Sequence, residues 1–166
     1  MAIYFDGLVG TKSQSSAAQA VKRLASRFSL HHESPSQWSP KSQLYWVSVV
    51  PRGMGLGVPY DDEQDREKFK TERKTFARDF YEMIRRENDI EVALLGWEIS
   101  DRWFDPTEKN RVLAGVTQIP NDMISMPGLV VSNEILEMLP NQNDFRPYTN
   151  RLHWVQIENW DRFESF

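Results

Sequence analysis

The chain has 166 residues, no cysteine and a net charge of −4, and 40% of its residues are hydrophobic. This composition predicts a single globular domain over residues 1–166 and argues against intrinsic disorder. Without cysteine, disulfides, thiolate catalysis and cysteine-ligated zinc are excluded. No apolar run approaches the roughly 20 residues of a membrane span. The first ten residues lack the basic run of a secretory signal, so we expect a cytoplasmic protein that binds no membrane.

The first third of the chain predicts two strands and a helix. Residues 2–9 are rich in β-formers and end near glycines, which predicts a strand. Apolar residues from Ala17 to Phe28 recur at helical spacing, after serines that can cap a helix. Residues 31–42 are rich in serine and contain Pro35 and Pro40, which is typical of a loop. The near-continuous apolar run at 44–50 predicts a strand that is covered on both faces, or one that is covered by a helix and has an aromatic residue facing partly outward.

A glycine-rich segment and a long helix follow. Residues 52–60 hold closely spaced glycines, but their spacing fits neither the dinucleotide fingerprint nor the P-loop. The helix predicted over residues 61–87 also opens with acids that would repel a phosphate. We therefore interpret the glycine-rich segment as a connection. Apolar runs at 89–100 and 112–119 predict two further strands.

Short elements complete the chain. Residues 129–131 predict a strand, Ser132 caps a short helix that ends at Pro140, and residues 152–157 predict a last strand after a polar loop at 141–150. The order β-α-β-α-β-β-β-α-β predicts an α+β fold. We expect a mixed, mostly antiparallel sheet, with two longer helices and one short helix packed on one face. A doubly wound α/β fold is the alternative, but the late strands lack connecting helices of crossover length.

The first strand carries a carboxylate in an apolar run. Phe5-Asp6-Gly7 resembles the first motif of haloacid dehalogenase-like phosphatases, in which a second aspartate follows two residues after the first. Leu8 stands at that position, so the general acid and one carboxylate ligand of the metal are missing. We therefore reject this activity.

Three carboxylates, Glu98, Asp101 and Asp105, lie among aromatic residues at the end of the predicted strand 89–100. Carboxylates beside aromatic rings can hydrolyse glycosides, and they can bind a divalent cation through oxygen. However, Glu98 and Asp101 would point to opposite faces of a continuous strand, and Arg102 offers an ion-pair partner. We expect a strand followed by a turn, and we keep a hydrolase-like enzyme using these carboxylates as the alternative function.

The three histidines do not form a metal-binding pattern. His31 and His32 are adjacent on a predicted loop, and His153 is far away in the sequence. No nucleophile-elbow pattern surrounds any serine. The sequence therefore predicts no catalytic residue, no metal ligand and no cofactor.

Charge is distributed unevenly along the chain. Residues 1–60 hold six Lys or Arg against two acids, a balance of +4, whereas residues 61–166 hold 14 basic and 22 acidic residues, a balance of −8. Four of the six tryptophans lie beyond residue 88. An acidic surface with aromatic anchors suits a basic protein partner, because complementary potentials steer the encounter and buried aromatic rings supply affinity. The net negative charge disfavours nucleic acid as a partner.

The sequence thus predicts an acidic module that recognises and inhibits a basic protein, such as a toxin or an enzyme, in the manner of bacterial immunity proteins and antitoxins. Trp103 and Trp160 are the expected aromatic anchors, because acids follow each of them closely and each lies near a predicted turn or the end of the sequence. The expected contact surface lies in the C-terminal half and comprises Asp101, Trp103, Asp105, Glu108, Asp144, Glu158, Trp160 and Asp161.

Overall fold

The structure, a computed structural model, describes residues 5–26, 30–32, 44–51, 63–97, 99, 119 and 123–163. The elements of the N-terminal part are β1 (Phe5–Thr11), α1 (Gln14–Ala25), β2 (Leu30–His32), β3 (Tyr45–Pro51), α2 (Glu63–Arg86) and β4 (Ile90–Trp97). Those of the C-terminal part are β5 (Val130–Ser132), α4 (Asn133–Met138), β6 (Phe145–Pro147), β7 (Leu152–Val155) and the short 3-10 helix η2 (Trp160–Phe163).

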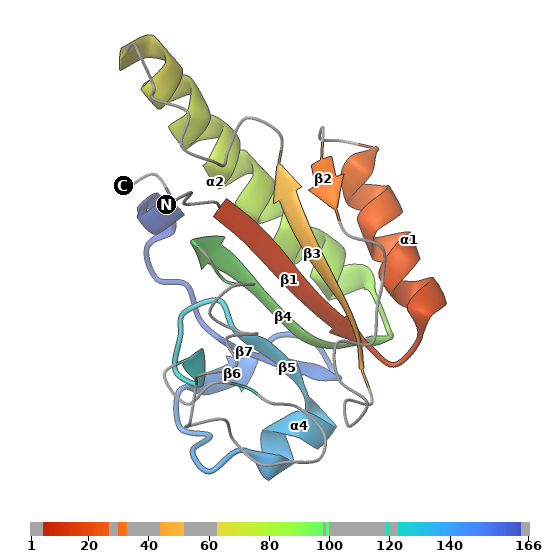
Figure 1. Ribbon diagram of the computed structural model, residues 1–166. Coiled ribbons are helices and arrows are strands. Elements are labelled where there is room, and N and C mark those ends of the chain that lie inside the picture. The colour runs from red at the N-terminus through yellow and green to blue at the C-terminus, as the bar shows by residue number, and fades with distance from the viewer. Residues whose placement is uncertain are drawn as a thin grey trace, which may run out of the picture.

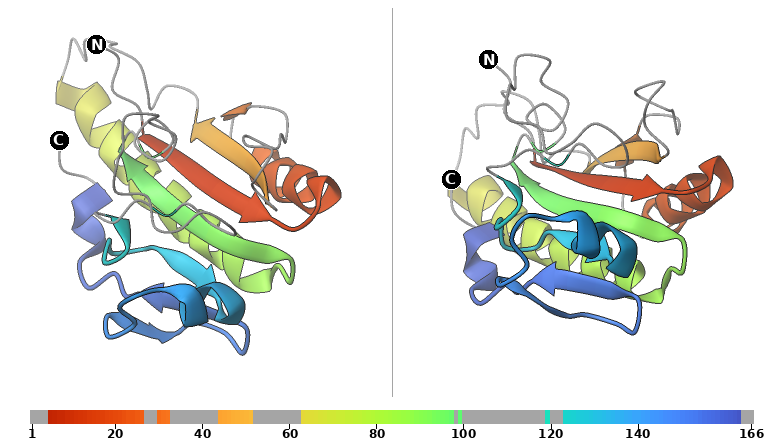
Figure 2. Two further views of the ribbon diagram at one scale, coloured as in Figure 1. Left: turned by 60° about the horizontal axis from the view of Figure 1, so that its bottom comes forward. Right: turned by 90° about the horizontal axis from the view of Figure 1, so that it is seen from below.

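The strands form one seven-stranded sheet in the order β2-β3-β1-β4-β5-β7-β6. Every described pairing is antiparallel. Figure 1 shows the long helix α2 crossing behind β1, β3 and β4, and Figure 2 shows the same arrangement from two further directions. The predicted α+β class is confirmed.

Local sequence explains where α1 and α4 begin and which residues occupy the last turn of α2. Ser13 caps α1, because its hydroxyl accepts a hydrogen bond from the Ser16 backbone N–H at 3.1 Å. Ser132 caps α4 in the same way, as predicted, and accepts from the Ile135 N–H at 3.4 Å. Basic residues Arg85 and Arg86 occupy the last turn of α2, where they complement the helix dipole.

Two short strands fall in segments that were expected to be loops. His31 and His32 belong to β2, which pairs with β3, although residues 31–42 predict a loop. β6 lies inside the predicted polar loop 141–150 and pairs with β7. In both cases pairing with a neighbouring strand stabilises the short strand, although its local composition is typical of a loop. The predicted strand 112–119 lies outside the described residues except for Ile119.

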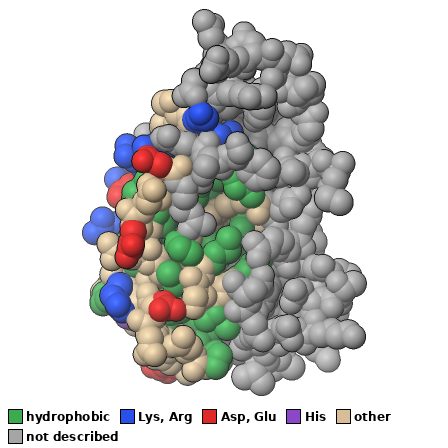
Figure 3. Space-filling model, turned by 90° about the vertical axis from the view of Figure 1, so that its left-hand side faces the viewer, with side chains coloured by type: hydrophobic (Ala, Val, Ile, Leu, Met, Phe, Trp, Pro, Cys, Tyr) green, Lys and Arg blue, Asp and Glu red, His purple; other side chains and the backbone are tan. Residues whose placement is uncertain are grey.

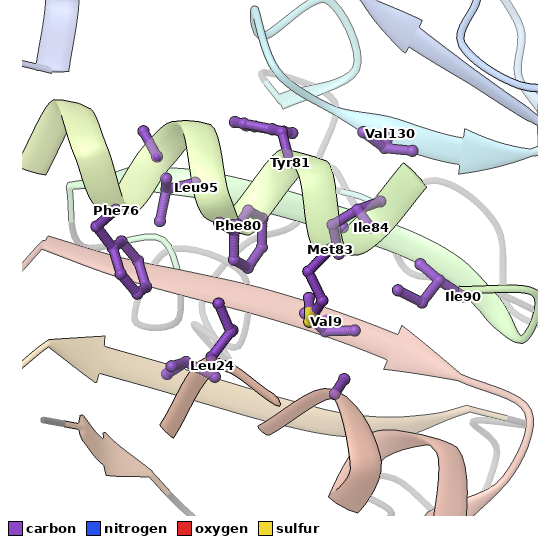
Figure 4. Close-up of a cluster of buried hydrophobic side chains, with 14 of the residues drawn as sticks. Val9, Leu24, Phe76, Phe80, Tyr81, Met83, Ile84, Ile90, Leu95 and Val130 are labelled. Atoms are coloured by element: carbon purple, nitrogen blue, oxygen red, sulfur yellow. The ribbon is translucent and has the colours of Figure 1, made fainter. Parts of the chain in front are cut away.

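The core has two layers, one on each face of the sheet. On one face, α1 and α2 pack against alternate residues of the central strands, including Phe5, Val9, Val47 and Leu95. Figure 4 shows side chains of α2 pointing onto β1. On the other face, Leu8, Val92 and Leu94 pack with residues that include Ile135 of α4. The two longer helices therefore share one face and the short helix lies on the other, so the expectation of one face for all three is wrong.

Within the described residues, no helix is long and apolar enough to cross a membrane.

Candidate functional site

Four of the eight predicted contact residues can be placed. Asp101, Trp103, Asp105 and Glu108 lie outside the described residues, as does Glu98 of the alternative carboxylate cluster. The described part holds no group of three or more His, Asp or Glu side chains that could bind a metal ion. The hydrolase-like alternative therefore stays a prediction. The four placed residues are Asp144, Glu158, Trp160 and Asp161.

Asp144 and Glu158 line one groove of about 640 Å³ at the β6–β7 edge of the sheet. Asp144 directly precedes β6 and Glu158 follows β7. The hairpin pairs Phe145 with Val155, which brings the two acids to the same end. We call this surface the acidic groove, and it is lined by Ser125, Pro127, Asp144, Arg146, Val155, Gln156, Glu158 and Asn159.

The two carboxylates of the acidic groove have no basic partner in the described part of the chain. Asp144 Oδ2 accepts a hydrogen bond from the Ser125 hydroxyl at 2.6 Å. Its other oxygen, Oδ1, has no hydrogen-bond partner among the described residues. The nearby Arg146 guanidinium donates to the carbonyls of Asn143 and Phe145, at 2.8 and 3.0 Å. Because both acids are exposed, the groove presents negative charge to solvent.

Trp160 and Asp161 have different surroundings. The Asp161 carboxylate pairs with Lys74 of α2, so its charge is largely compensated. Trp160 is half-buried, and its ring meets Tyr81 and Phe163 with centroids 5.8 and 5.9 Å apart. The structure therefore does not place Trp160 in the same groove as Asp144 and Glu158.

Trp160 belongs to a second groove of about 430 Å³, which is lined by residues of α2 and by residues between 147 and 160. We call it the aromatic groove, and it is lined by Arg78, Tyr81, Glu82, Arg85, Pro147, Tyr148, Trp154 and Trp160. Figure 3 shows hydrophobic side chains between charged ones on the side of the molecule where η2 lies.

Hydrogen bonds fix two of the rings in the aromatic groove. The Tyr148 hydroxyl donates to the Tyr81 carbonyl at 2.6 Å, and the Tyr81 hydroxyl donates to the Gly128 carbonyl at 3.0 Å. The rings of Tyr148 and Trp154 lie 4.7 Å apart with 33° between their planes. Burial, and to a lesser degree the charge of Glu82, raise the pKa of Tyr148 to about 12, so its hydroxyl keeps its proton at neutral pH.

Asp6 is fully buried in the central strand β1. Its Oδ1 accepts a hydrogen bond from the Ile99 backbone N–H at 2.7 Å, and the Ser48 hydroxyl donates to Oδ2 at 3.4 Å. A buried carboxylate needs such donors. The residue thus connects β1 with β3 and with the chain beyond β4.

Sequence reasoning missed most of the aromatic groove. Trp154 lies in a predicted strand and Tyr148 in a predicted loop, while Tyr81 and Arg78 come from the distant helix α2. No local spacing connects these residues. Of the residues in this groove, only Trp160 is predicted from the sequence to be functional, as an aromatic anchor for a protein partner.

Comparisons with known proteins assign no role to either groove. No protein-family model, curated protein or solved structure matches this chain. The function therefore rests on the geometry and charge of the two grooves.

Proposed function

We propose that the protein is a binding module that recognises and inhibits a basic protein partner, and that the acidic groove is part of its contact surface. The observation that carries this proposal is the pair Asp144 and Glu158. Both carboxylates are exposed in one groove, and no described Lys or Arg lies within ion-pair distance of either.

A basic side chain of the partner fits this arrangement. A Lys or Arg that enters the groove donates charge-assisted hydrogen bonds to Glu158 and to the second oxygen of Asp144. The amides of Gln156 and Asn159 line the same groove and offer further polar contacts. The protein inhibits its partner when the basic residues that bind in the acidic groove belong to the partner's own functional site.

The other predicted contact residues also belong to the proposed contact surface, but we expect them to contribute unequally to partner binding. Asp161 contributes less because Lys74 already pairs with it. Trp160 is half-buried and lines the aromatic groove rather than the acidic groove, so it contributes less to this contact surface. Asp101, Trp103, Asp105 and Glu108 remain expected contacts. A cytoplasmic location, which suits a chain without cysteine, belongs to the same proposal.

The experiment compares two charge reversals of the same kind. The partner is captured from native cells with the full chain and purified, and its association and dissociation rates are then measured at low and high salt. Glu158→Lys should lower the association rate about tenfold at low salt, because complementary charge steers the encounter. Glu137→Lys is the matched control, since Glu137 is also exposed and has no described ion pair but lies on α4.

Two results would contradict the proposal. One is an acidic partner. The other is an affinity that is unaffected by salt and falls equally in Glu158→Lys and Glu137→Lys, because a general charge effect does not depend on the groove.

A further inference from the structure

The aromatic groove is a second candidate binding site, which shares no lining residue with the acidic groove and one residue, Trp160, with the expected partner surface. We propose that it binds a small, planar aromatic molecule carrying an anionic group, with the chemistry of a nucleoside monophosphate. The groove's volume of about 430 Å³ lies within the range of roughly 300–1,000 Å³ that is typical of small-molecule sites.

The walls of the groove are held in place before any ligand arrives. Tyr81 is fully enclosed and forms the floor, with its hydroxyl bonded to Gly128. Edge-to-face contacts join Tyr81 to Trp154 and Trp160, with centroids 6.2 and 5.8 Å away and planes inclined by 61° and 82°. Tyr148 is fixed by its hydrogen bond to the Tyr81 carbonyl. A rigid, half-exposed aromatic surface stacks on a flat ring at a small entropic cost.

The rim of the groove carries excess positive charge. Glu82 is the only acid in the lining, and its carboxylate faces Arg85 at 3.8 Å and Arg86 at 3.6 Å. Arg78 is exposed, and among the described residues no carboxylate lies within ion-pair distance of it. The Arg85 guanidinium lies over the Tyr148 ring, 5.9 Å from its centroid. Two guanidinium groups beside stacked rings suit a phosphate attached to a flat base.

Other ligand classes fit the groove less well. A quaternary ammonium group also binds to aromatic rings, but the positive charges of Arg78 and Arg85 would repel it. A neutral sugar would leave the Arg78 guanidinium unused. A nucleic-acid polymer is opposed by the net charge of −4, because its affinity depends on neutralising many phosphates. A single mononucleotide requires only the local charge of the rim.

The experiment measures the binding of AMP, adenosine and inorganic phosphate to the full-length chain by calorimetry. AMP should bind at least about tenfold more tightly than either fragment, because only AMP offers both the ring and the charge. Arg78→Gln should weaken AMP about tenfold and leave adenosine unchanged. Lys22→Gln is the control: it removes one exposed positive charge from α1, at a residue outside the groove lining, and it should change AMP binding less than twofold.

A second measurement locates the site. The indole N–H resonances of Trp154 and Trp160, assigned from Trp→Phe variants, should shift on addition of AMP, whereas that of the core residue Trp46 should not. The proposal would be overturned by no AMP binding at millimolar concentration, by equal losses in Arg78→Gln and Lys22→Gln, or by a shift confined to tryptophans outside the groove. Tight binding of a single-stranded oligonucleotide that is unaffected by Arg78→Gln would also overturn it.

Discussion

At the scale of single residues, two glycines set how closely α2 approaches the sheet. A Cβ on Gly7 would lie 2.7 Å from the Phe80 ring, so this ring packs directly on the backbone of β1. A Cβ on Gly128 would lie 2.2 Å from the Tyr81 hydroxyl, and Gly128 has a φ of 93°, a conformation that glycine adopts without steric cost. Both contacts involve residues of α2 and fix the helix against the sheet. The floor of the aromatic groove therefore depends on a glycine far away in the sequence.

Tyr148 gives the clearest prediction at this scale. Its pKa is raised to about 12 in the folded chain, mainly by burial, against an ordinary value of 10.0. Because the pKa of Tyr148 is higher in the folded chain than in the unfolded chain, its neutral hydroxyl favours the folded state. This contribution to the free energy of unfolding is fully present below pH 10 and is lost as the pH rises from 10 to 12. In an absorbance titration, the difference between the wild type and Tyr148→Phe should show Tyr148 ionising near pH 12.

The same variant loses the hydrogen bond to the Tyr81 carbonyl, which should lower the free energy of unfolding at neutral pH by about 0.5–1.5 kcal/mol. Urea unfolding of both proteins measures this difference. A difference between the titrations of the wild type and Tyr148→Phe that is centred near pH 10 would show that the hydroxyl is not buried as described.

At the scale of elements, long apolar runs were predictable and short strands were not. The runs at 44–50 and 89–100 correspond to β3 and β4, because a strand covered on both faces needs apolar residues throughout. β6 contains Arg146 and Pro147 and exists because it pairs with β7. That hairpin also explains the acidic groove, whose acids looked unrelated in the sequence. The aromatic groove needs α2 beside β7, a contact between distant parts of the chain that no local pattern encodes.

A bulge between β1 and β4 gives the second prediction. Gly10 pairs with Val92 but Thr11 pairs with Ile90, so Glu91 is the extra residue, and its side chain is buried. Its carboxylate meets Arg151 at 2.9 Å, at the start of β7, and Lys12 at 3.3 Å, at the end of β1. One carboxylate thus joins three strands of the sheet.

Glu91→Gln should lower the free energy of unfolding by about 1–3 kcal/mol, because it removes the charge that compensates these two cations while keeping the shape of the side chain. The matched control is Glu134→Gln, which removes the exposed ion pair that Lys12 makes with α4 and should cost much less. Chemical denaturation of the two variants compares them. Equal losses of stability in the two variants would mean that burial does not make the ion pairs of Glu91 more stabilising than the exposed pair of Glu134.

At the scale of the whole molecule, the C-terminal part is attached to the central strands through few backbone pairs. β4 and β5 share two residue pairs, Val92 with Val131 and Ala93 with Val130. Further attachment comes from Arg73 and Lys74 of α2, which contact Phe163 and Asp161 of η2. Both proposed binding surfaces include residues beyond β5, so their geometry depends on this attachment.

Arg73 is the buried part of that attachment and gives the last prediction. Its Nε donates to the Phe163 carbonyl at 2.9 Å, and its guanidinium lies 5.1 Å from the centroid of the Trp97 ring. Arg73→Leu should remove about 2–4 kcal/mol of stability, because it removes contacts that include a charged hydrogen bond and a cation–π contact. If the attachment is local, hydrogen exchange should rise first in residues 156–163, while β1 and β3 stay protected. Arg78→Gln changes the same helix at an exposed position and should leave this exchange unchanged. A uniform rise across all strands in Arg73→Leu would instead show that the sheet and its C-terminal edge unfold as one unit, and that both grooves are as stable as the core itself.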